Sequence, residues 1–338
     1  MNIRTWFKRS AQSFLLYCGY RQIRDLILGL TGNAHVMVLC YHVVTEKFHP
    51  NGIQPATFRK HIQWLNKKFR VVSIEESTDI LIKKKKTKKP ICAVTFDDGY
   101  AENYLHALPI LREFSIPATF FVASGFVDKA ITFPDDQKRG LIDFLPFSSH
   151  QLKSLSEAGM SIGSHTSSHV DCGVEENLHE IGSSKRELEE ILGLQVTTFA
   201  FPYGKSENIH PYSPKVLKTA GYTCGFSCYG GYNYPRTDGS GTYPDQAPVF
   251  KRIHAPSSDS GVELLFQLTM QDLIVLRKRV RTSLSKVGKT AEMKIGQGKQ
   301  YFVVGVLLQM LATICLESLR AICRSCSKRR IILGKPDV

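Results

Sequence analysis

The sequence predicts an α/β protein in which parallel strands alternate with helices. Short apolar runs rich in β-branched and aromatic residues recur along the chain, as at 35–42, 91–94 and 118–123. Segments with helical spacing of apolar residues separate these runs, and this alternation is typical of a parallel β/α fold. With 338 residues, of which 43% are hydrophobic, the chain can bury one large core.

The same patterns assign the remaining elements in order. Further strands are expected at 71–74, from 160, and at 196–201, 222–227 and 249–254. Helices are expected at 58–69, from 75 to the lysine run at 83–89, and at 105–114, 151–159, 175–192 and 213–220. Residues 128–149 contain Pro134 and Pro146 and are expected to form a long irregular loop on the rim of the fold.

The net charge of +14 is concentrated in three segments, 1–34, 83–89 and 277–338. Positive charge at the chain ends suits an anionic membrane surface better than a nucleic-acid groove, so no nucleic-acid partner is expected. The lysine run at 83–89 is expected to be disordered and to serve solubility. The chain therefore divides into a basic amphipathic segment (1–34), a main domain (35–256) and a basic helical extension (257–338) that could associate with a membrane.

The two ends and the cysteines bear on location. The apolar run at 14–18 is followed by Arg21 and Arg24 and by no nearby cleavage site, which disfavours a secretory signal; an interfacial helix and a helix packed on the fold stay open. The apolar run at 301–316 is slightly short for a transmembrane helix, and spanning, interfacial and buried arrangements stay open. The nine cysteines show no disulfide framework. We expect a location in the cytoplasm or at the cytoplasmic face of the inner membrane.

Two adjacent carboxylates, Asp97 and Asp98, follow the strand that begins at Ile91. Like charges at the end of a buried strand repel each other and resist desolvation unless a cation or hydrogen-bond donors compensate them. The carboxyl ends of strands are also where α/β barrels place their chemistry. An Asp-Asp-Gly turn that caps the next helix would explain the same residues without chemistry, so a second observation has to decide.

Two histidines supply that observation. His165 and His169 are four residues apart after the strand that begins at 160, and this spacing lets two imidazoles reach one ion. With Asp98 they would form a site of two histidines and one carboxylate, which leaves coordination positions open for water and substrate. Such a site suits hydrolysis better than a structural role.

Three short motifs occur in order: TFDDG at 95–99, SHTSSH at 164–169 and FAFPYG at 199–204. Over about residues 35–255, the sequence resembles the NodB-like polysaccharide deacetylases. The strand that ends in Tyr41 and His42 is similar to the subset that includes the biofilm poly-N-acetylglucosamine deacetylases. The resemblance implies a distorted (β/α) barrel as the catalytic domain (35–256) and metal-dependent removal of an N- or O-linked acetyl group.

The resemblance also implies a division of labour between the two carboxylates. Asp98, His165 and His169 would bind a divalent metal, with zinc as the best match and cobalt, nickel or iron as alternatives. Asp97 would be the general base. Pro202, Thr166 and Ser167 would support the ligands or contact the substrate.

The remaining roles are implied with less agreement between this sequence and the family. His42 would be the general acid and the backbone N–H of Tyr203 would hold the oxyanion, while His254 is the alternative acid. Many members carry arginine in place of Ala200 as the partner of the base, and Arg252 is the candidate replacement. The family's Asp-Trp pair in the substrate groove is missing, and tyrosines of 228–246 could stack on the sugar instead.

The resemblance predicts a metal-dependent hydrolase that removes acetyl groups, above all N-acetyl groups, from a cell-surface polysaccharide or its lipid-linked precursor. A deacetylase or deformylase of a small lipid-linked sugar and a catalytically inactive glycan-binding barrel are the alternatives. The presence of both aspartates and both histidines opposes the inactive barrel. The expected partners are an N-acetylated glycan as substrate and an anionic membrane surface at the basic termini.

Overall fold

The computed structural model describes residues 20–235 and 244–257 of the chain. Its strands are β1 (Val36–Tyr41), β2 (Val43–Val44), β3 (Gly52–Ile53), β4 (Arg70–Val71), β5 (Ile91–Phe96), β6 (Ala118–Val122), β7 (Ser161–Ser164), β8 (Thr198–Ala200), β9 (Cys224–Phe226), β10 (Val249–Phe250) and β11 (Ile253–His254). Its α-helices are α2 (Tyr20–Leu30), α3 (Pro55–Lys68), α4 (Ile74–Ile82), α5 (Leu108–Glu113), α6 (Pro134–Lys138), α7 (Ser149–Glu157), α8 (His179–Leu192) and α9 (Ser213–Thr219). A π-helical turn, η1 (Asn103–Ala107), leads into α5.

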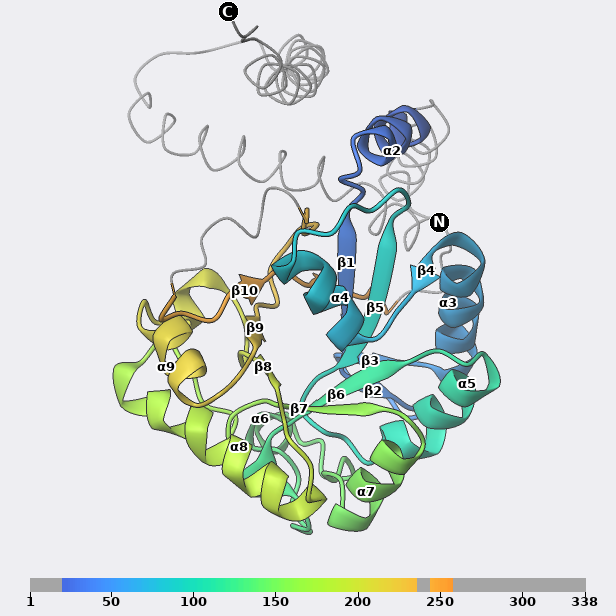
Figure 1. The fold of residues 1–338 in the computed structure, drawn as a ribbon. Coiled ribbons are helices and arrows are strands. Elements are labelled where there is room, and N and C mark those ends of the chain that lie inside the picture. Colours follow the sequence, from blue (N-terminus) through green and yellow to red (C-terminus); the bar gives the residue numbers. More distant parts are fainter. Residues whose placement is uncertain (1–19, 236–243, 258–338) are drawn as a thin grey trace, which may run out of the picture. The chain divides into compact units, whose positions relative to one another are not determined.

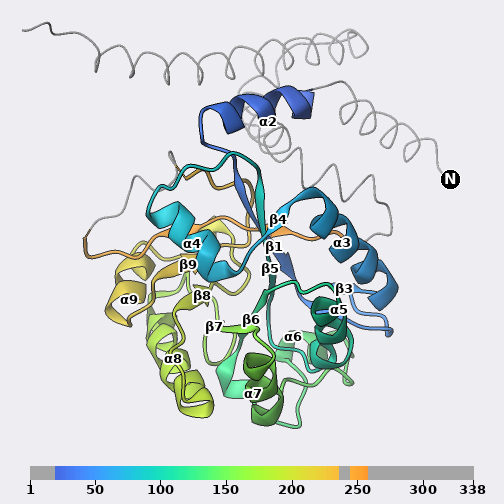
Figure 2. The same cartoon turned by 45° about the vertical axis from the view of Figure 1, so that its right-hand side comes forward.

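One parallel sheet organises the described residues. Its strand order is β10-β9-β8-β7-β6-β5-β1-β11, with β4 paired to β5, while β2 and β3 form a separate pair. Figures 1 and 2 show this sheet curled on itself, with helices α3, α5, α7, α8 and α9 around its outer side. The predicted α/β class and distorted barrel are therefore confirmed.

The prediction of a single strand at 249–254 is wrong, and the break within it lies where the two ends of the sheet come together. β10 pairs with β9 at one end of the sheet, whereas β11 pairs with β1 at the other end. Only Lys251 and Arg252 separate these two strands, so the two ends of the sheet meet there. The Asn233 side chain accepts from the Lys251 N–H at 2.9 Å and donates to the Lys251 carbonyl at 2.8 Å, which takes both groups out of a strand ladder.

Side-chain alternation along the strands separates the inside of the barrel from its helical layer. One buried cluster contains alternate residues of β1 and β5, residues of β9, and residues of α4. A second cluster packs the other face of the sheet against the helices α3, α5, α7 and α8. Cys40, Asp97 and Cys228 continue the first series towards the carboxyl ends of β1, β5 and β9. The alternation therefore directs these three side chains into the barrel interior at the carboxyl ends of the strands.

The helix predicted at 105–114 is present, but Leu105 is exposed instead of buried. The Leu108 N–H donates to the Asn103 carbonyl across the π-helical turn, five residues back. This wider turn rotates the residues before it away from the 3.6-residue pattern on which the prediction rested. Leu108 and Leu111, which follow the turn, are buried as expected.

Two segments expected to be irregular have defined structure. Residues 134–138 of the predicted rim loop form α6. In the lysine run at 83–89, Thr87 is buried, and its N–H donates to the Gly32 carbonyl at 3.0 Å. The Thr87 hydroxyl donates to the Ala34 carbonyl at 2.5 Å. The expected disorder of this run is wrong because Thr87 ties it to the segment between α2 and β1.

Several predictions concern the ends of the chain. Of the segment 1–34, the structure describes residues from 20 onwards, which include α2. Residues 258–338, with the apolar run at 301–316, lie outside the described residues. The domain boundaries, the membrane surface and the cytoplasmic location therefore stay predictions. Among residues 20–235 and 244–257, no helix is long and apolar enough to cross a membrane.

Candidate active site

The carboxyl ends of the parallel strands deliver the predicted site residues to one edge of the barrel. His42 follows β1, Asp97 and Asp98 follow β5, and His165 and His169 follow β7. All five line a cavity of about 200 Å³ at this edge. The cavity is also lined by Tyr203, which follows β8. Residues from four strands thus share one small space.

The backbone around this cavity is strained. In the described part of the chain, seven residues other than glycine have a positive φ, and four of them are Asp98, Thr166, His169 and Tyr203. Their φ angles lie between 57° and 72°, in the left-handed region that residues with a Cβ avoid. Strain of this kind costs about 1–3 kcal/mol per residue and is concentrated at functional sites. It indicates a functional site independently of the sequence motifs.

Asp98, His165 and His169 form a compact group of potential metal ligands. Asp98 Oδ1 lies 3.4 Å from His165 Nε2 and 3.2 Å from His169 Nε2. One ligand atom from each residue lies within 4.8 Å of the other two. Asp98 and His165 are buried, so water screens the charges of the group poorly.

The contacts of His165 fit a bound cation. Its Nδ1 lies 2.8 Å from the Ala200 carbonyl oxygen. A carbonyl oxygen only accepts, so Nδ1 carries the proton, and Nε2 of the neutral ring then presents a lone pair to the Asp98 carboxylate. Two acceptors that face each other need a cation or a second proton between them. An Nδ1–H donated to a carbonyl is also the usual support of a metal-binding histidine.

The close contacts within this group shift the pKa values of Asp98 and His169. Burial would raise the pKa of Asp98, but its contacts with the His165 and His169 imidazoles outweigh it and hold this pKa well below 3.8. Burial would lower the pKa of His169, but the Asp98 carboxylate outweighs that effect and raises it above 6.5. Asp98 is therefore a carboxylate at neutral pH, which is the form that binds a metal.

Asp97 lies beside Asp98 but is neutralised by the protein itself. Arg252 Nη1 donates to Asp97 Oδ1 at 2.6 Å, and Arg252 Nη2 donates to Asp97 Oδ2 at 2.7 Å. Both side chains are buried. Burial would raise the pKa of Asp97, but the guanidinium outweighs it and lowers the pKa to about 2. Arg252 is thus the partner of Asp97, as the sequence predicted in the absence of an arginine at position 200.

His42 and His254 lie together, with ring centroids 5.1 Å apart. Only His42 is among the residues that line the cavity. Its Nδ1 is buried and has no hydrogen-bond partner among the described residues. Burial lowers the pKa of His42, and partial burial together with His42 lowers that of His254 to about 4. The geometry therefore places His42, and not His254, where it can reach a substrate in the cavity.

The third motif forms a tight turn at the edge of the cavity. The Tyr203 N–H has no acceptor among the described residues, and the Tyr203 side chain is half exposed. The Pro202 carbonyl accepts from the Gly204 N–H at 2.5 Å, which fixes the turn. A Cβ on Gly204 would lie 2.3 Å from the Cys228 nitrogen, so only glycine fits this position.

Thr166 and Ser167 hold the loop that carries the two histidines. The Thr166 hydroxyl accepts from the Val170 N–H at 3.3 Å, and its carbonyl accepts from the Ser124 N–H at 3.2 Å. The Ser167 hydroxyl donates to Glu187 of α8 at 2.8 Å. Both residues therefore hold the loop of His165 and His169 in place.

Helix α6, which lies in a segment expected to be an irregular rim loop, forms one wall of the site. Asp135 and Asp136 of α6 both line the cavity. Asp135 accepts from the Tyr203 hydroxyl at 3.1 Å, while buried Asp136 accepts from the Tyr100 hydroxyl at 2.7 Å and contacts His49 Nε2 at 3.1 Å. Proline at the first helical position with acids in the first turn is a helix-start signal, and it was available in this segment.

The chain is similar to known proteins. Residues 84–225 match the polysaccharide deacetylase family. This segment of the chain is therefore similar to polysaccharide deacetylases. Over 199 residues, the chain is 27% identical to YxkH of Bacillus subtilis (strain 168), which is named as a candidate polysaccharide deacetylase. That match covers 57% of this chain and 64% of YxkH, which is less than two thirds of the relative's length.

Solved structures share this fold. IcaB from Ammonifex degensii is 25% identical with a TM-score of 0.56, and the match covers 69% of this chain and 97% of IcaB. The polysaccharide deacetylase BC0361 from Bacillus cereus is 24% identical with a TM-score of 0.55, and the match covers 70% of this chain and 69% of BC0361. The predicted resemblance to polysaccharide deacetylases and the predicted barrel are therefore confirmed.

Proposed function

We propose that this chain is a divalent-metal-dependent deacetylase that removes N-acetyl groups from a cell-surface polysaccharide or its lipid-linked precursor. One observation carries the proposal: at a single cavity, Asp98 faces two imidazoles while Asp97 is paired with Arg252. This arrangement supports a metal site and a separate carboxylate base within reach of the same substrate atom. The similarity to polysaccharide deacetylases supports a glycan as the substrate class.

Asp98, His165 and His169 would hold the metal ion. Two imidazole nitrogens and one carboxylate oxygen suit zinc, and they also suit cobalt, nickel or iron. When bound, such an ion supplies Lewis-acid polarisation of the acetyl carbonyl and a water of lowered pKa.

The chain's own residues would carry the proton transfers. Arg252 keeps Asp97 ionised and fixes both its oxygens, so that the carboxylate can accept the proton of the attacking water. The Tyr203 N–H would donate to the oxyanion of the tetrahedral intermediate. His42, once protonated, would donate to the departing nitrogen. We prefer His42 to His254 because His42 lines the cavity and His254 is not among its lining residues.

The size of the cavity bears on the substrate. Its volume of about 200 Å³ is below the roughly 300–1,000 Å³ of typical ligand pockets. It suits one sugar residue with its acetyl group better than several sugars enclosed together. A small lipid-linked sugar is therefore the second candidate substrate.

Acetate release tests the proposal. The zinc-loaded full chain is incubated with N-acetylglucosamine oligomers, a cell-surface glycan extract and a lipid-linked N-acetylated sugar, beside Asp97→Asn and the surface control Asp79→Asn. We expect acetate from wild type and from Asp79→Asn, loss on chelation, return with zinc, and a decrease of about 10³-fold in Asp97→Asn. Equal acetate release from Asp97→Asn and wild type, or none from any substrate with metal bound, would contradict the proposal.

A further inference from the structure

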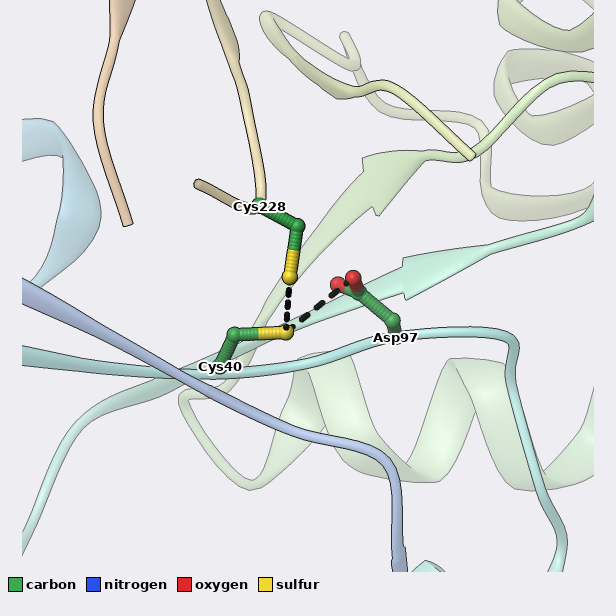
Figure 3. Close-up of side chains that lie close together, drawn as sticks. All are labelled: Cys40, Asp97 and Cys228. Atoms are coloured by element: carbon green, nitrogen blue, oxygen red, sulfur yellow. Dashed lines mark hydrogen bonds between the residues drawn. The ribbon is translucent and has the colours of Figure 1, made fainter. Parts of the chain in front are cut away.

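Two cysteines that are 188 residues apart in the sequence lie side by side next to Asp97, the predicted base. Cys40 is in β1, and Cys228 follows β9 by two residues. Their sulfurs lie 3.5 Å apart, and Cys40 Sγ lies 3.2 Å from Asp97 Oδ2. Figure 3 shows both thiols directed towards each other, with the Asp97 carboxylate beside them. Nothing in the proposed hydrolysis uses either thiol.

A second metal site is one interpretation of this cluster, since its three potential ligand atoms lie within 4.8 Å of one another. The contacts of Asp97 oppose it. Both Asp97 oxygens already accept from Arg252, whose guanidinium is buried in the same place. A divalent cation bound there would have to lie next to a buried cation without solvent to screen the repulsion. The cluster is better described as a pair of thiols in contact.

The two thiols differ in access. Cys40 is fully buried, whereas Cys228 is half-buried and lines the active-site cavity. A small oxidant that enters the cavity can therefore reach the Cys228 sulfur before that of Cys40. The contact with Cys40 and the Arg252 guanidinium outweigh burial and lower the pKa of Cys228, which favours the reactive thiolate.

We propose that Cys40 and Cys228 form an oxidation site at which hydrogen peroxide produces a reversible disulfide. The Cys228 thiolate attacks one peroxide oxygen, so that the O–O bond breaks, hydroxide leaves and Cys228 becomes a sulfenic acid. The Cys40 sulfur then attacks the Cys228 sulfur, so that an S–S bond forms, the S–O bond breaks, and the hydroxyl group leaves as water with the Cys40 proton. The hydroxide of the first step becomes the second water with the proton that the Cys228 thiol lost. Overall, two thiols and one peroxide give one disulfide and two waters.

The disulfide would alter the site in two ways, and this consequence rests on the proposed function. The sulfurs must approach from 3.5 Å to about 2.05 Å, and the Cys40 S–H that faces Asp97 is lost. The Cys228 N–H donates to the Gly204 carbonyl at 2.8 Å, so movement of Cys228 is transmitted to the turn that carries Tyr203. A displacement of about 1 Å at a catalytic group can cost 10²-fold in rate. We expect kcat/KM for deacetylation to decrease by about that factor.

Peptide mapping tests the oxidation site without any reference to activity. The zinc-loaded full chain is treated with a few equivalents of hydrogen peroxide, its remaining thiols are alkylated, and the digest is analysed by mass spectrometry with and without dithiothreitol. Wild type should yield a dithiothreitol-sensitive peptide that joins Cys40 to Cys228. Cys40→Ser and Cys228→Ser should not. Cys224→Ala, which removes a buried thiol four residues before Cys228, should still form the link.

Acetate release from the same samples tests the consequence, with each oxidised sample compared to its own reduced form. Oxidised wild type and Cys224→Ala should lose about 10²-fold in kcat/KM and recover it with dithiothreitol, while the two serine variants should keep their reduced activity. Wild type that stays fully thiol, or that gives only overoxidised Cys228, would overturn the inference. A link with unchanged acetate release would overturn control of activity. A link without acetate in either state would overturn the proposed function and leave the oxidation site supported.

Discussion

Asp97 and Asp98 are neighbours in the sequence, but their carboxylates lie in two different electrostatic environments. Asp97 is buried on the barrel side, where Arg252, which lies between β10 and β11, contacts both its oxygens. Asp98 lies on the loop side, where two imidazoles approach a single oxygen at 3.2 and 3.4 Å. The fold supplies the Arg252 cation for one carboxylate, while the other faces the two histidines of the proposed metal site.

This difference explains how two like charges can be adjacent in a buried site. A pair of buried carboxylates would normally share a proton, because both cannot ionise next to each other. Here the two side chains point to separate partners, and the pKa of each is lowered. This difference in environment is the reason why we propose Asp97 as the base and Asp98 as the metal ligand, and substitutions on either side can test it.

The largest effect is expected when the cation beside Asp97 is removed. Arg252→Met leaves a buried carboxylate without its partner, which should lower the free energy of unfolding by about 3–5 kcal/mol. The double variant Asp97→Asn, Arg252→Met removes both charges and should recover much of that loss. Urea unfolding of the metal-free proteins measures both changes. Equal stability of Arg252→Met and wild type would show that the pair is not what stabilises Asp97.

Removal of the candidate acid should affect activity rather than stability. His42→Ala should lower kcat/KM for deacetylation by about 10²-fold or more, because protonation of the leaving nitrogen is lost. His254→Ala is the matched control on the adjacent strand, and its effect should be clearly smaller. Steady-state acetate release decides between them. A larger loss in His254→Ala would transfer the acid role to His254.

Acid should reduce the contribution of Asp97 to the free energy of unfolding in a defined pH range. The pKa of Asp97 is lowered from 3.8 to about 2 in the folded protein, so its contribution to stability is complete above 3.8 and is lost as pH falls towards 2. The shift corresponds to about 2 kcal/mol. The difference in free energy of unfolding between metal-free wild type and Asp97→Asn should therefore shrink by about that amount between pH 5 and pH 2. A constant difference would contradict the lowered pKa.

The smallest effect is expected for an ion pair of the same chemistry on the surface. Arg59 and Glu113 pair between α3 and α5, but both side chains are more than 40% exposed. Arg59→Ala should lower the free energy of unfolding by only about 0.2–1 kcal/mol, and less at high salt. Urea unfolding at two salt concentrations checks this. A loss as large as that of Arg252→Met would show that burial is not what separates the two pairs.

The sequence could predict the surroundings of Asp98 much better than those of Asp97. The ligand side comes from two short motifs, in which the spacing of His165 and His169 is visible directly. The Arg252 contact was predicted only because position 200 is alanine, where many members of the family carry arginine. Its cause, the break after Phe250, depends on the Asn233 side chain, which no strand or helix pattern reveals.

The same limit applies to the cysteines and to α6. Cys40 and Cys228 are 188 residues apart, and they meet only because the sheet curls until β1 and β9 face the same interior. Strand periodicity can direct each thiol inwards, but it cannot say which strands face each other. The α6 wall was missed for a simpler reason, since its helix-start signal lies in a segment interpreted only as a loop.

Zinc content of the two asparagine variants tests directly whether Asp98 binds the metal and Asp97 does not. Wild type, Asp97→Asn and Asp98→Asn are loaded with zinc, dialysed against a weak chelator, checked for folding by circular dichroism, and analysed for metal. Asp97→Asn should keep about one zinc ion per chain, as wild type does, while losing activity, and Asp98→Asn should lose the ion. Zinc lost as completely from Asp97→Asn as from Asp98→Asn, or retained in full by Asp98→Asn, would contradict the assignment of one carboxylate to the metal and the other to the base.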